Sequence, residues 1–212
     1  MPIEIKPYTI DTLDSVSLHH VACVLLLDTS GSMTHISTDG RRPIDELNAG
    51  IRAFKEETLN NTSLSSEERS AIDVAIVSFG GDEPRVNVDF APISEITIPT
   101  LDANGMTPMG KALDVAMDMI EARKTLYKEI GTPYYRPWIF CITDGEPTDE
   151  WRQTAQRLRD MEDRHKLLAY CVGVTGFNIG LMTKIFDEKR IIQLKGLEFT
   201  TFFKFLSQCF NS

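Results

Sequence analysis

A chain of 212 residues is long enough to bury one medium-sized core without disulfides or a structural metal. Its composition, with 42% hydrophobic and 25% charged residues, is that of an ordinary globular protein and argues against a disordered or fibrous chain. The formal net charge of −9 argues against broad nucleic-acid binding, which needs a positive surface.

The apolar runs are too short to span a membrane. The longest, residues 21–27, is far below the roughly 20 residues that cross a bilayer. The first residues include Glu4, Asp11 and Asp14 and contain no apolar stretch of the signal-peptide type. We therefore expect a cytoplasmic protein with no membrane partner.

Four cysteines lie far apart in the chain, and no pair has the C-x-x-C spacing that is typical of a zinc site. Three lie in apolar, strand-like runs and one lies in the last predicted helix. They are Cys23, Cys141, Cys171 and Cys209. We expect all four to be reduced thiols, most of them buried.

Strand-like and helical patterns alternate from the start of the chain. Residues 20–27 (HVACVLLL) are almost continuously apolar, which predicts a central parallel strand with both faces buried. A helix is predicted from Pro43, a residue suited to a first helical turn, to Thr58. Residues 72–79 and 86–90 predict two more strands, and Gly-Gly-Asp at 80–82 predicts a hairpin turn between them.

The second half continues the alternation. Residues 109–127 predict a long helix, and residues 138–143 (WIFCIT) predict the fourth strand. A helix carrying Trp151, Ala155 and Leu158 follows. The elements predicted after this helix are a strand at 167–174 (LLAYCVGV), a short helix at 179–186, an edge strand at 191–194 and a terminal helix. The terminal helix has an apolar stripe, interpreted as core packing, that consists of Phe199, Phe202, Phe203, Leu206 and Phe210.

This order of elements predicts an α/β fold. The central sheet is expected to be doubly wound and mostly parallel, with one antiparallel edge hairpin strand and helices on both faces. Ligands of such folds bind beyond the carboxyl ends of the strands, where the strand order reverses. The loops that follow the buried strands are therefore the place to look for functional residues.

Three such segments carry oxygen-bearing side chains. The first strand ends in Asp28-Thr29-Ser30-Gly31-Ser32, the fourth leads into Asp144, and Thr107 precedes the long helix. Two carboxylates and three hydroxyls are hard ligands, which suit Mg²⁺, Mn²⁺ or Ca²⁺ better than zinc or copper. An ion held in this way keeps enough positive charge to attract a carboxylate from outside.

Each segment also has a simpler interpretation. An aspartate at the end of a strand, such as Asp28, is often a helix cap. Thr107 before Pro108 is a plausible N-cap with proline at the first helical position. Asp144-Gly145 by itself signals only a turn. The co-occurrence of all three segments, in this order and beside these elements, favours the metal site.

These residues carry a specific resemblance. Asp28, Ser30 and Ser32 match the DxSxS element of the metal-ion-dependent adhesion site (MIDAS) of von Willebrand factor A (VWA) domains, and Thr107 and Asp144 match the two residues that complete it. The resemblance covers nearly the whole chain and implies a Rossmann-like VWA fold. It also implies an ion, Mg²⁺ or else Mn²⁺ or Ca²⁺, bound by these five residues and completed by a partner's Glu or Asp.

A narrower resemblance rests on LLLDTSGSM, NGMTPMGKAL, ITDGEPTDEW and the terminal FFKFLSQ. These segments look like stand-alone bacterial VWA proteins of the tellurite-resistance TerY type. That likeness implies a non-enzymatic, metal-dependent scaffold in a stress or phosphorylation system, with a kinase-like protein or a metal-dependent protein phosphatase as partner. We expect residues 1–18 to be an N-terminal lead segment and residues 19–212 to form a single VWA domain.

Two loops have residues suited to contacts. The segment 34–42 (THISTDGRR) departs from the related proteins and carries His35, Asp39, Arg41 and Arg42. It is interpreted either as a solvated loop or as a rim whose arginines pair with acidic residues of the partner. The segment 131–137 (GTPYYRP) precedes the fourth strand, so we expect it at the opposite edge of the sheet.

The alternatives to a binding module fit less well. A Mg²⁺-dependent phosphatase-like hydrolase using Asp28 as nucleophile would want a second aspartate where Ser30 stands. Neither Ser30 nor Ser32 has the G-x-S-x-G elbow of a serine hydrolase, and no nucleotide-binding G-x-x-x-x-G-K-[ST] motif occurs. A purely structural ion would favour more charged ligands, and surface adhesion does not suit reduced cysteines.

Overall fold

The computed structural model describes residues 18–36, 40–174, 177–194 and 199–209. Its strands are β1 (Val21–Asp28), β2 (Ile72–Phe79), β3 (Pro84–Pro92), β4 (Trp138–Thr143), β5 (Leu168–Gly173) and β6 (Ile191–Gln193). They form one sheet in the order β3-β2-β1-β4-β5-β6, in which only the β2–β3 pair is antiparallel. The expected doubly wound, mostly parallel sheet with one antiparallel edge strand is thus confirmed.

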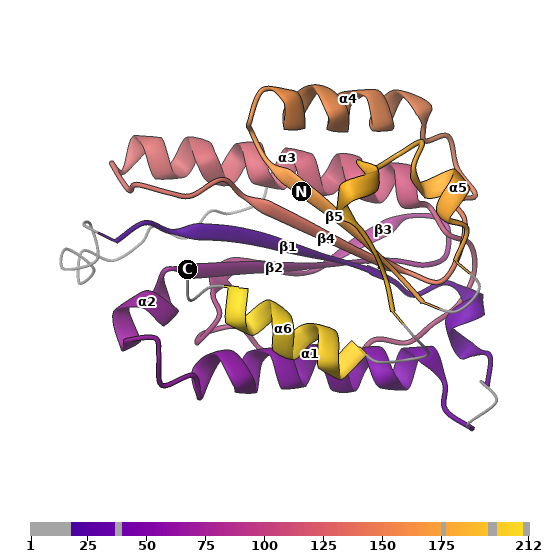
Figure 1. Cartoon of the computed structure of the whole chain (residues 1–212), viewed down its shortest axis with the longest axis horizontal. Coiled ribbons are helices and arrows are strands. Elements are labelled where there is room, and N and C mark those ends of the chain that lie inside the picture. The colour runs from indigo at the N-terminus through magenta and orange to yellow at the C-terminus, as the bar shows by residue number, and fades with distance from the viewer. Residues whose placement is uncertain (1–17, 37–39, 175–176, 195–198, 210–212) are drawn as a thin grey trace.

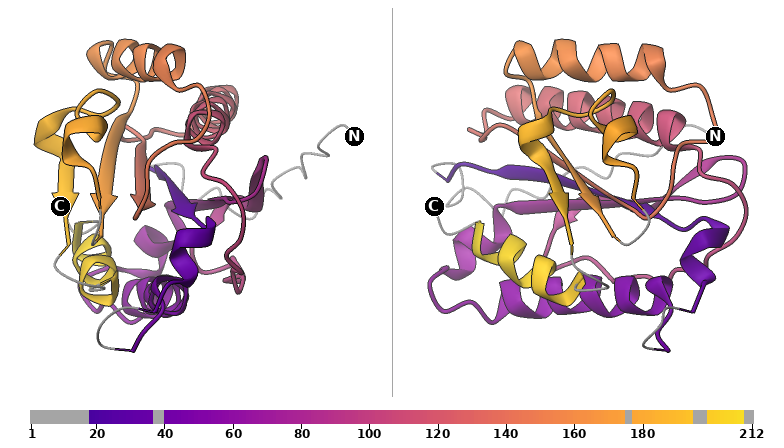
Figure 2. Two further views of the ribbon diagram at one scale, coloured as in Figure 1. Left: turned by 90° about the vertical axis from the view of Figure 1, so that its right-hand side faces the viewer. Right: turned by 45° about the vertical axis from the view of Figure 1, so that its right-hand side comes forward.

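The helices cover both faces of this sheet (Figure 1). They are α1 (Pro43–Leu59), α2 (Ser66–Ser70), α3 (Met109–Glu129), α4 (Arg152–Asp163), α5 (Ile179–Met182) and α6 (Phe199–Cys209), with 3-10 turns at Gly31–Thr34 and Glu188–Arg190. Helices α1 and α6 lie on one face, and α3 and α4 lie on the other (Figure 2). Within the part of the chain that is described, no helix is both long and apolar enough to cross a membrane.

A few boundaries differ from the sequence-based expectations. The short helix expected at 179–186 ends at Met182, and β3 extends from Pro84 to Pro92 rather than over 86–90. Helix α2 was not predicted, although Ser65 and Glu68 form a capping box that the S-x-x-E spacing signals. The expected lead segment, residues 1–18, lies outside the described residues except for its last residue.

The central strands are apolar on both sides because each side meets a helical layer. Every residue of β1 is buried; Leu25 and Leu27 face the layer of α1 and α6, while Val24 and Leu26 face that of α3 and α4. This two-sided burial is the physical reason for the nearly continuous apolar run.

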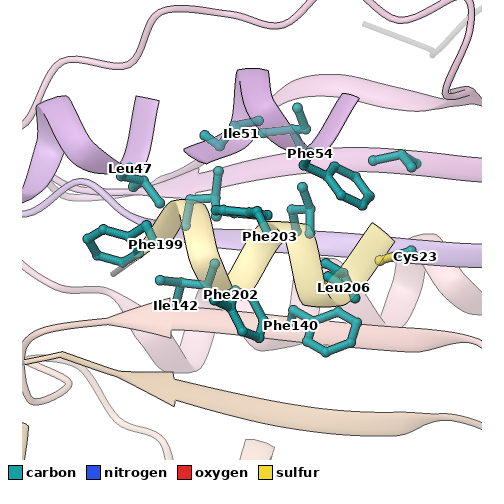
Figure 3. Packing of buried hydrophobic residues seen from close by; sticks show 14 of the residues in the cluster. Cys23, Leu47, Ile51, Phe54, Phe140, Ile142, Phe199, Phe202, Phe203 and Leu206 are labelled. Carbon is teal, nitrogen blue, oxygen red and sulfur yellow. The ribbon is translucent and has the colours of Figure 1, made fainter. Parts of the chain in front are cut away.

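The aromatic stripe of α6 is core, as expected. Phe199, Phe202, Phe203 and Leu206 pack against α1 and the sheet (Figure 3), whereas Phe210 lies outside the described residues. Gly50 of α1 permits the close approach, since a Cβ at this position would lie 2.6 Å from a ring carbon of Phe203. The ring of Phe203 on α6 therefore packs close to the backbone of α1 at Gly50.

Three of the four cysteines are buried free thiols, as expected, namely Cys23, Cys141 and Cys171. The side chain of Cys209 lies outside the described part of the chain. Burial raises the pKa of the Cys141 thiol well above its ordinary value, which keeps it protonated and unreactive.

A buried ionic cluster lies where the strands begin. Asp73 of β2 is fully buried, accepts a hydrogen bond from Tyr127 of α3, and forms an ion pair in which its Oδ1 is 2.8 Å from Nη2 of Arg123, also on α3. Its Oδ2 is also 2.9 Å from Nδ1 of His20. The segment 131–137 lies at this same edge, as expected, because Tyr134 bridges to His20.

Candidate functional site

The predicted site residues meet at the carboxyl end of the sheet. Asp28 is the last residue of β1, Asp144 directly follows β4, and Thr107 lies two residues before α3. Strand β1 lies between β2 and β4 in the sheet: the chain adds β2 and β3 on one side of β1 and then crosses to add β4 on the other. The residues therefore lie at the point where the strand order reverses, which is the usual ligand position in such sheets.

The Asp28 carboxylate is held from two sides. Its Oδ1 accepts the backbone N–H of Ser30 at 2.8 Å, and its Oδ2 accepts the hydroxyl of Thr143 at 2.5 Å. Thr143 also accepts the N–H of Gly145 at 3.1 Å, which ties the loop after β4 to the same group. Asp28 is a rigid, fully buried anion that links the ends of β1 and β4.

A chain of hydroxyls connects the serines to the second carboxylate. The Oγ atoms of Ser30 and Ser32 are 3.0 Å apart, and Ser32 Oγ donates to Asp144 Oδ1 at 2.6 Å. Ser30 is buried and Ser32 is half-buried on the 3-10 turn. The serines thus face the end of β4, although they lie more than a hundred residues from it in the chain.

Backbone contacts position Thr107. The loop that carries it is joined to the first segment by Gly31 N–H donating to Gly105 O at 3.0 Å and Asn104 N–H donating to Thr29 O at 2.8 Å. Gly105 has φ +69°, and a Cβ there would lie 2.6 Å from the Cα of Gly81, so only glycine fits. This packing places Thr107 beside the DxSxS turn.

The capping interpretation of Thr107 is wrong. Helix α3 begins at Met109, and the residue before it, Pro108, supplies no side-chain cap. The carboxylate of Asp149 instead accepts the N–H groups of Gly110 and Lys111, at 3.0 and 2.8 Å. Because another loop satisfies the start of α3, the Thr107 hydroxyl is left for the site.

The site oxygens converge on one small region. A Cβ built on Gly145 would lie 3.8 Å from Ser32 Oγ, 3.9 Å from Thr107 Oγ1 and 4.0 Å from Asp28 Oδ2. Oxygens from two of the predicted segments therefore lie within 4.0 Å of one point beside Gly145 of the third segment, and Asp144 of that segment is joined to them through Ser32 Oγ. Such an arrangement matches the needs of a small cation that takes several oxygen ligands.

Electrostatics also favour a cation. Burial raises the pKa of Asp28 to about 6, and it raises the pKa of Asp144 as well. Among the described residues, no lysine or arginine forms an ion pair with either carboxylate. Partly or fully buried anions without such a lysine or arginine partner are costly, and a divalent ion would neutralise both carboxylates.

The ligand set argues for a hard ion. Nowhere in the described ranges do three or more His, Cys, Asp or Glu side chains gather in a way that could hold a metal. The candidate site has two carboxylates and three hydroxyls instead, a set better suited to Mg²⁺ or Mn²⁺ than to a structural zinc. The residues present therefore fit the ion that the sequence predicts.

The arginines of the 34–42 segment are engaged within the chain. Arg42 forms two hydrogen bonds to Asp45, at 2.7 and 2.8 Å, and Arg41 is 3.1 Å from Glu46. Asp39 lies outside the described residues. The paired arginines fit a solvated loop better than a rim that awaits a partner's acidic residues.

Sequence reasoning missed the residues that support the site. Thr143 holds Asp28, Thr148 Oγ1 accepts the Thr107 N–H at 3.0 Å, and Asp149 caps α3. Thr148 and Asp149 lie in the GEPTDEW stretch, whose local pattern indicates only a turn. Their roles depend on segments about 40 residues away in the chain, so no local signal identifies them.

Known structures share this fold at low sequence identity. The PilB minor pilin from Streptococcus sanguinis superimposes with a TM-score of 0.62 at 14% identity, over 91% of this chain and 61% of its own. Proximal thread matrix protein 1 from the mussel byssus, in a structure with a zinc-occupied MIDAS motif, superimposes with a TM-score of 0.56 at 14% identity, over 89% of this chain and 46% of its own. Manganese-loaded TRAP protein from Plasmodium vivax superimposes with a TM-score of 0.54 at 19% identity, over 86% of this chain and 71% of its own.

The chain spans about half the length of the mussel protein. No curated protein matches the sequence. The sequence model of the von Willebrand factor type A domain matches residues 23–204. This range includes all six strands apart from the first two residues of β1, and it ends within α6. The chain therefore belongs to the von Willebrand factor type A domain family.

Proposed function

We propose that this VWA domain is a metal-dependent protein-interaction module. VWA domains commonly bind metal through a MIDAS and mediate protein interactions. The proposed ligands are Asp28, Ser30, Ser32, Thr107 and Asp144. The supporting observation is that Ser32, Thr107 and Asp28 oxygens converge beside Gly145, with Asp144 hydrogen-bonded to Ser32. Within the described ranges, neither carboxylate pairs with a lysine or arginine.

The proposed mechanism uses the balance of charge at the site. The bound ion supplies an electrophilic centre, while Ser30, Ser32 and Thr107 offer it neutral oxygens. Thr143 and the Ser30 N–H keep Asp28 oriented. A glutamate or aspartate of the partner adds the further negative oxygen that hard ions favour. Ion and partner then bind cooperatively, each raising the affinity of the other by the same factor.

Mg²⁺ is the proposed physiological ion, with Mn²⁺ or Ca²⁺ as alternatives. By its resemblance to TerY-type proteins, the domain would act in a bacterial stress or tellurite-resistance system with a kinase-like protein or a metal-dependent phosphatase as partner. Residues 19–212 would form the one domain involved. The proposal rests on the LLLDTSGSM, NGMTPMGKAL and ITDGEPTDEW segments.

A phosphatase-like hydrolase is the second candidate and fits poorly. A nucleophilic Asp28 would have to reach a substrate, but its side chain is fully buried and each oxygen already accepts a hydrogen bond. The position two residues on, where an acid/base aspartate is needed, is Ser30. VWA domains are generally not enzymes, and we infer the same of this one.

Calorimetric titration of the wild type with Mg²⁺ and Mn²⁺ tests the proposal directly. One saturable site is expected, together with an ion-dependent rise in the unfolding temperature, because a ligand that binds only the folded state stabilises it. If none of Mg²⁺, Mn²⁺ and Ca²⁺ binds, the proposed mechanism is excluded.

Replacing Gly145 with alanine is expected to weaken Mn²⁺ binding by about tenfold or more, since the new methyl group would occupy space between three site oxygens. The added Cβ makes only ordinary contacts, at 3.8 Å or longer, so the fold should be unaffected. Gly180→Ala on α5, with a contact of 3.5 Å, is the matched control for calorimetry and thermal unfolding. Equal Mn²⁺ affinity in both variants would place the ion elsewhere.

Metal affinity is expected to fall below about pH 6. The ion needs ionised carboxylates, whereas burial raises the pKa of Asp28 to about 6, so protons compete with the ion below that pH. One displaced proton corresponds to about a tenfold loss of affinity per pH unit. Without metal, the raised pKa means that stability declines as the pH rises from about 4 to about 6. Calorimetry across pH 5–7 checks this, and a constant affinity would contradict it.

A further inference from the structure

Three exposed apolar side chains lie next to segments of the candidate metal site. The described residues include six exposed large hydrophobic side chains, and three of them adjoin site segments: Ile36, Met106 and Ile179, which are 72%, 54% and 43% exposed. We call these three the apolar rim. The other three lie elsewhere, with Val86 on β3 and Ile130 and Tyr135 at the edge where the strands begin.

Each rim residue is next in sequence to a residue that belongs to the site or is hydrogen-bonded to one of its segments. Met106 directly precedes Thr107. Ile36 follows His35, whose N–H donates to Ser32 O at 3.0 Å. Ile179 follows Asn178, whose side chain donates to Glu146 at 2.7 Å, two residues beyond Asp144.

These attachments place the rim at the carboxyl edge of the sheet, where α5 lies beside the strand ends (Figure 2).

Several basic side chains at this edge are paired within the chain. Arg41 and Arg42 contact acids of α1, and Lys111 of α3 contacts Glu83 at 2.5 Å. Glu146 and Asp82 add exposed negative charge. A partner segment with several acidic residues would meet repulsion from these carboxylates, whereas a single carboxylate would be attracted by the charge of the bound ion.

We propose that the site captures a single Asp or Glu flanked by large apolar residues. The carboxylate binds the ion, and the flanking side chains pack on Ile36, Met106 and Ile179. This assignment rests on the proposed function and specifies the partner's chemistry. Exposed apolar residues that surround a charged centre are typical of a binding surface, since their burial supplies affinity that the ion alone does not.

A library of short random peptides, panned on the wild type with Mn²⁺ and eluted with EDTA, tests the proposal. Recovered peptides should carry one acidic residue with Leu, Ile, Phe or Met beside it. The triple variant Ile36→Ser, Met106→Ser, Ile179→Ser should bind the synthesised consensus about tenfold or more weakly. Its Mn²⁺ affinity should be unchanged, and Tyr135→Ser, at the opposite edge, is the control.

The outcomes separate the two proposals. Metal-dependent peptides with acidic runs or without apolar neighbours, or full binding by the triple variant, would overturn the apolar rim and leave metal-dependent capture intact. Recovery of no EDTA-sensitive peptide by a wild type that binds Mn²⁺ would contradict carboxylate capture itself, and the rim with it. Weaker peptide binding by the Tyr135→Ser control would also count against the rim.

Discussion

Replacement of Asp28 by asparagine is expected to lower Mn²⁺ affinity by at least about 100-fold, the upper range for lost supporting groups at metal sites. Asparagine has nearly the same shape and keeps an oxygen that can accept the Ser30 N–H. It lacks the charge that attracts the ion. Calorimetry measures the affinity, and thermal unfolding with and without Mn²⁺ measures the linked stability.

Comparing the stability of the variant without and with Mn²⁺ distinguishes lost metal binding from lost folding. At pH 7 the buried Asp28 carboxylate is ionised above its raised pKa of about 6, at a cost to the metal-free fold. Asp28→Asn should therefore be at least as stable as the wild type without metal. The wild type should gain about 2.7 kcal/mol at a hundredfold excess of Mn²⁺ over Kd, and the variant almost nothing.

Asp102→Asn is the matched control, because Asp102 is an exposed carboxylate on the loop that leads to Thr107. It removes the same charge near the site without touching the ligands, and its Mn²⁺ affinity should stay close to that of the wild type. A folded Asp28→Asn protein that binds Mn²⁺ as tightly as this control would show that Asp28 is not a ligand.

Replacement of Asp73 by alanine is expected to lower the free energy of unfolding by about 3–5 kcal/mol, the range for breaking a buried ion pair. Arg123 is only 7% exposed, and the loss of Asp73 would leave its charge buried without this counterion. Tyr127 and His20 would lose the same acceptor. Urea unfolding measures the change.

The position of Asp73 gives this prediction a second readout. Asp73 is near the start of β2, whereas the candidate metal site is at the opposite ends of the strands, so Mn²⁺ affinity of the folded variant should be unchanged. Asp118→Ala removes the exposed pair with Arg157 and should cost no more than about 1 kcal/mol. Equal losses in the two variants would mean that the buried cluster contributes no special stability.

The amino-acid pattern alone predicts the architecture and the position of the candidate site residues at one edge of the sheet. Both follow from local patterns, because an apolar run such as residues 20–27 needs burial on two sides whatever its neighbours are. The carboxyl ends of parallel strands necessarily share one edge of the sheet, so Asp28 and Asp144 could be expected to lie together. Their roles as metal ligands stay a prediction.

Where the local sequence allows two roles for a residue, contacts between distant segments determine which one it takes. Thr107 would suit an N-cap, but Asp149, 39 residues beyond Gly110, occupies that role and leaves the hydroxyl to the site. By contrast, Arg41 and Arg42 pair with Glu46 and Asp45 in the first turn of α1, which are local contacts between residues three to five positions apart.

The partners of Asp73 could not be predicted from the sequence either, since nothing in residues 72–79 indicates an ion pair with residues about fifty positions away. A polar side chain takes the partner that folding brings within hydrogen-bond distance. That choice depends on contacts between distant segments, which periodicity along the chain does not record.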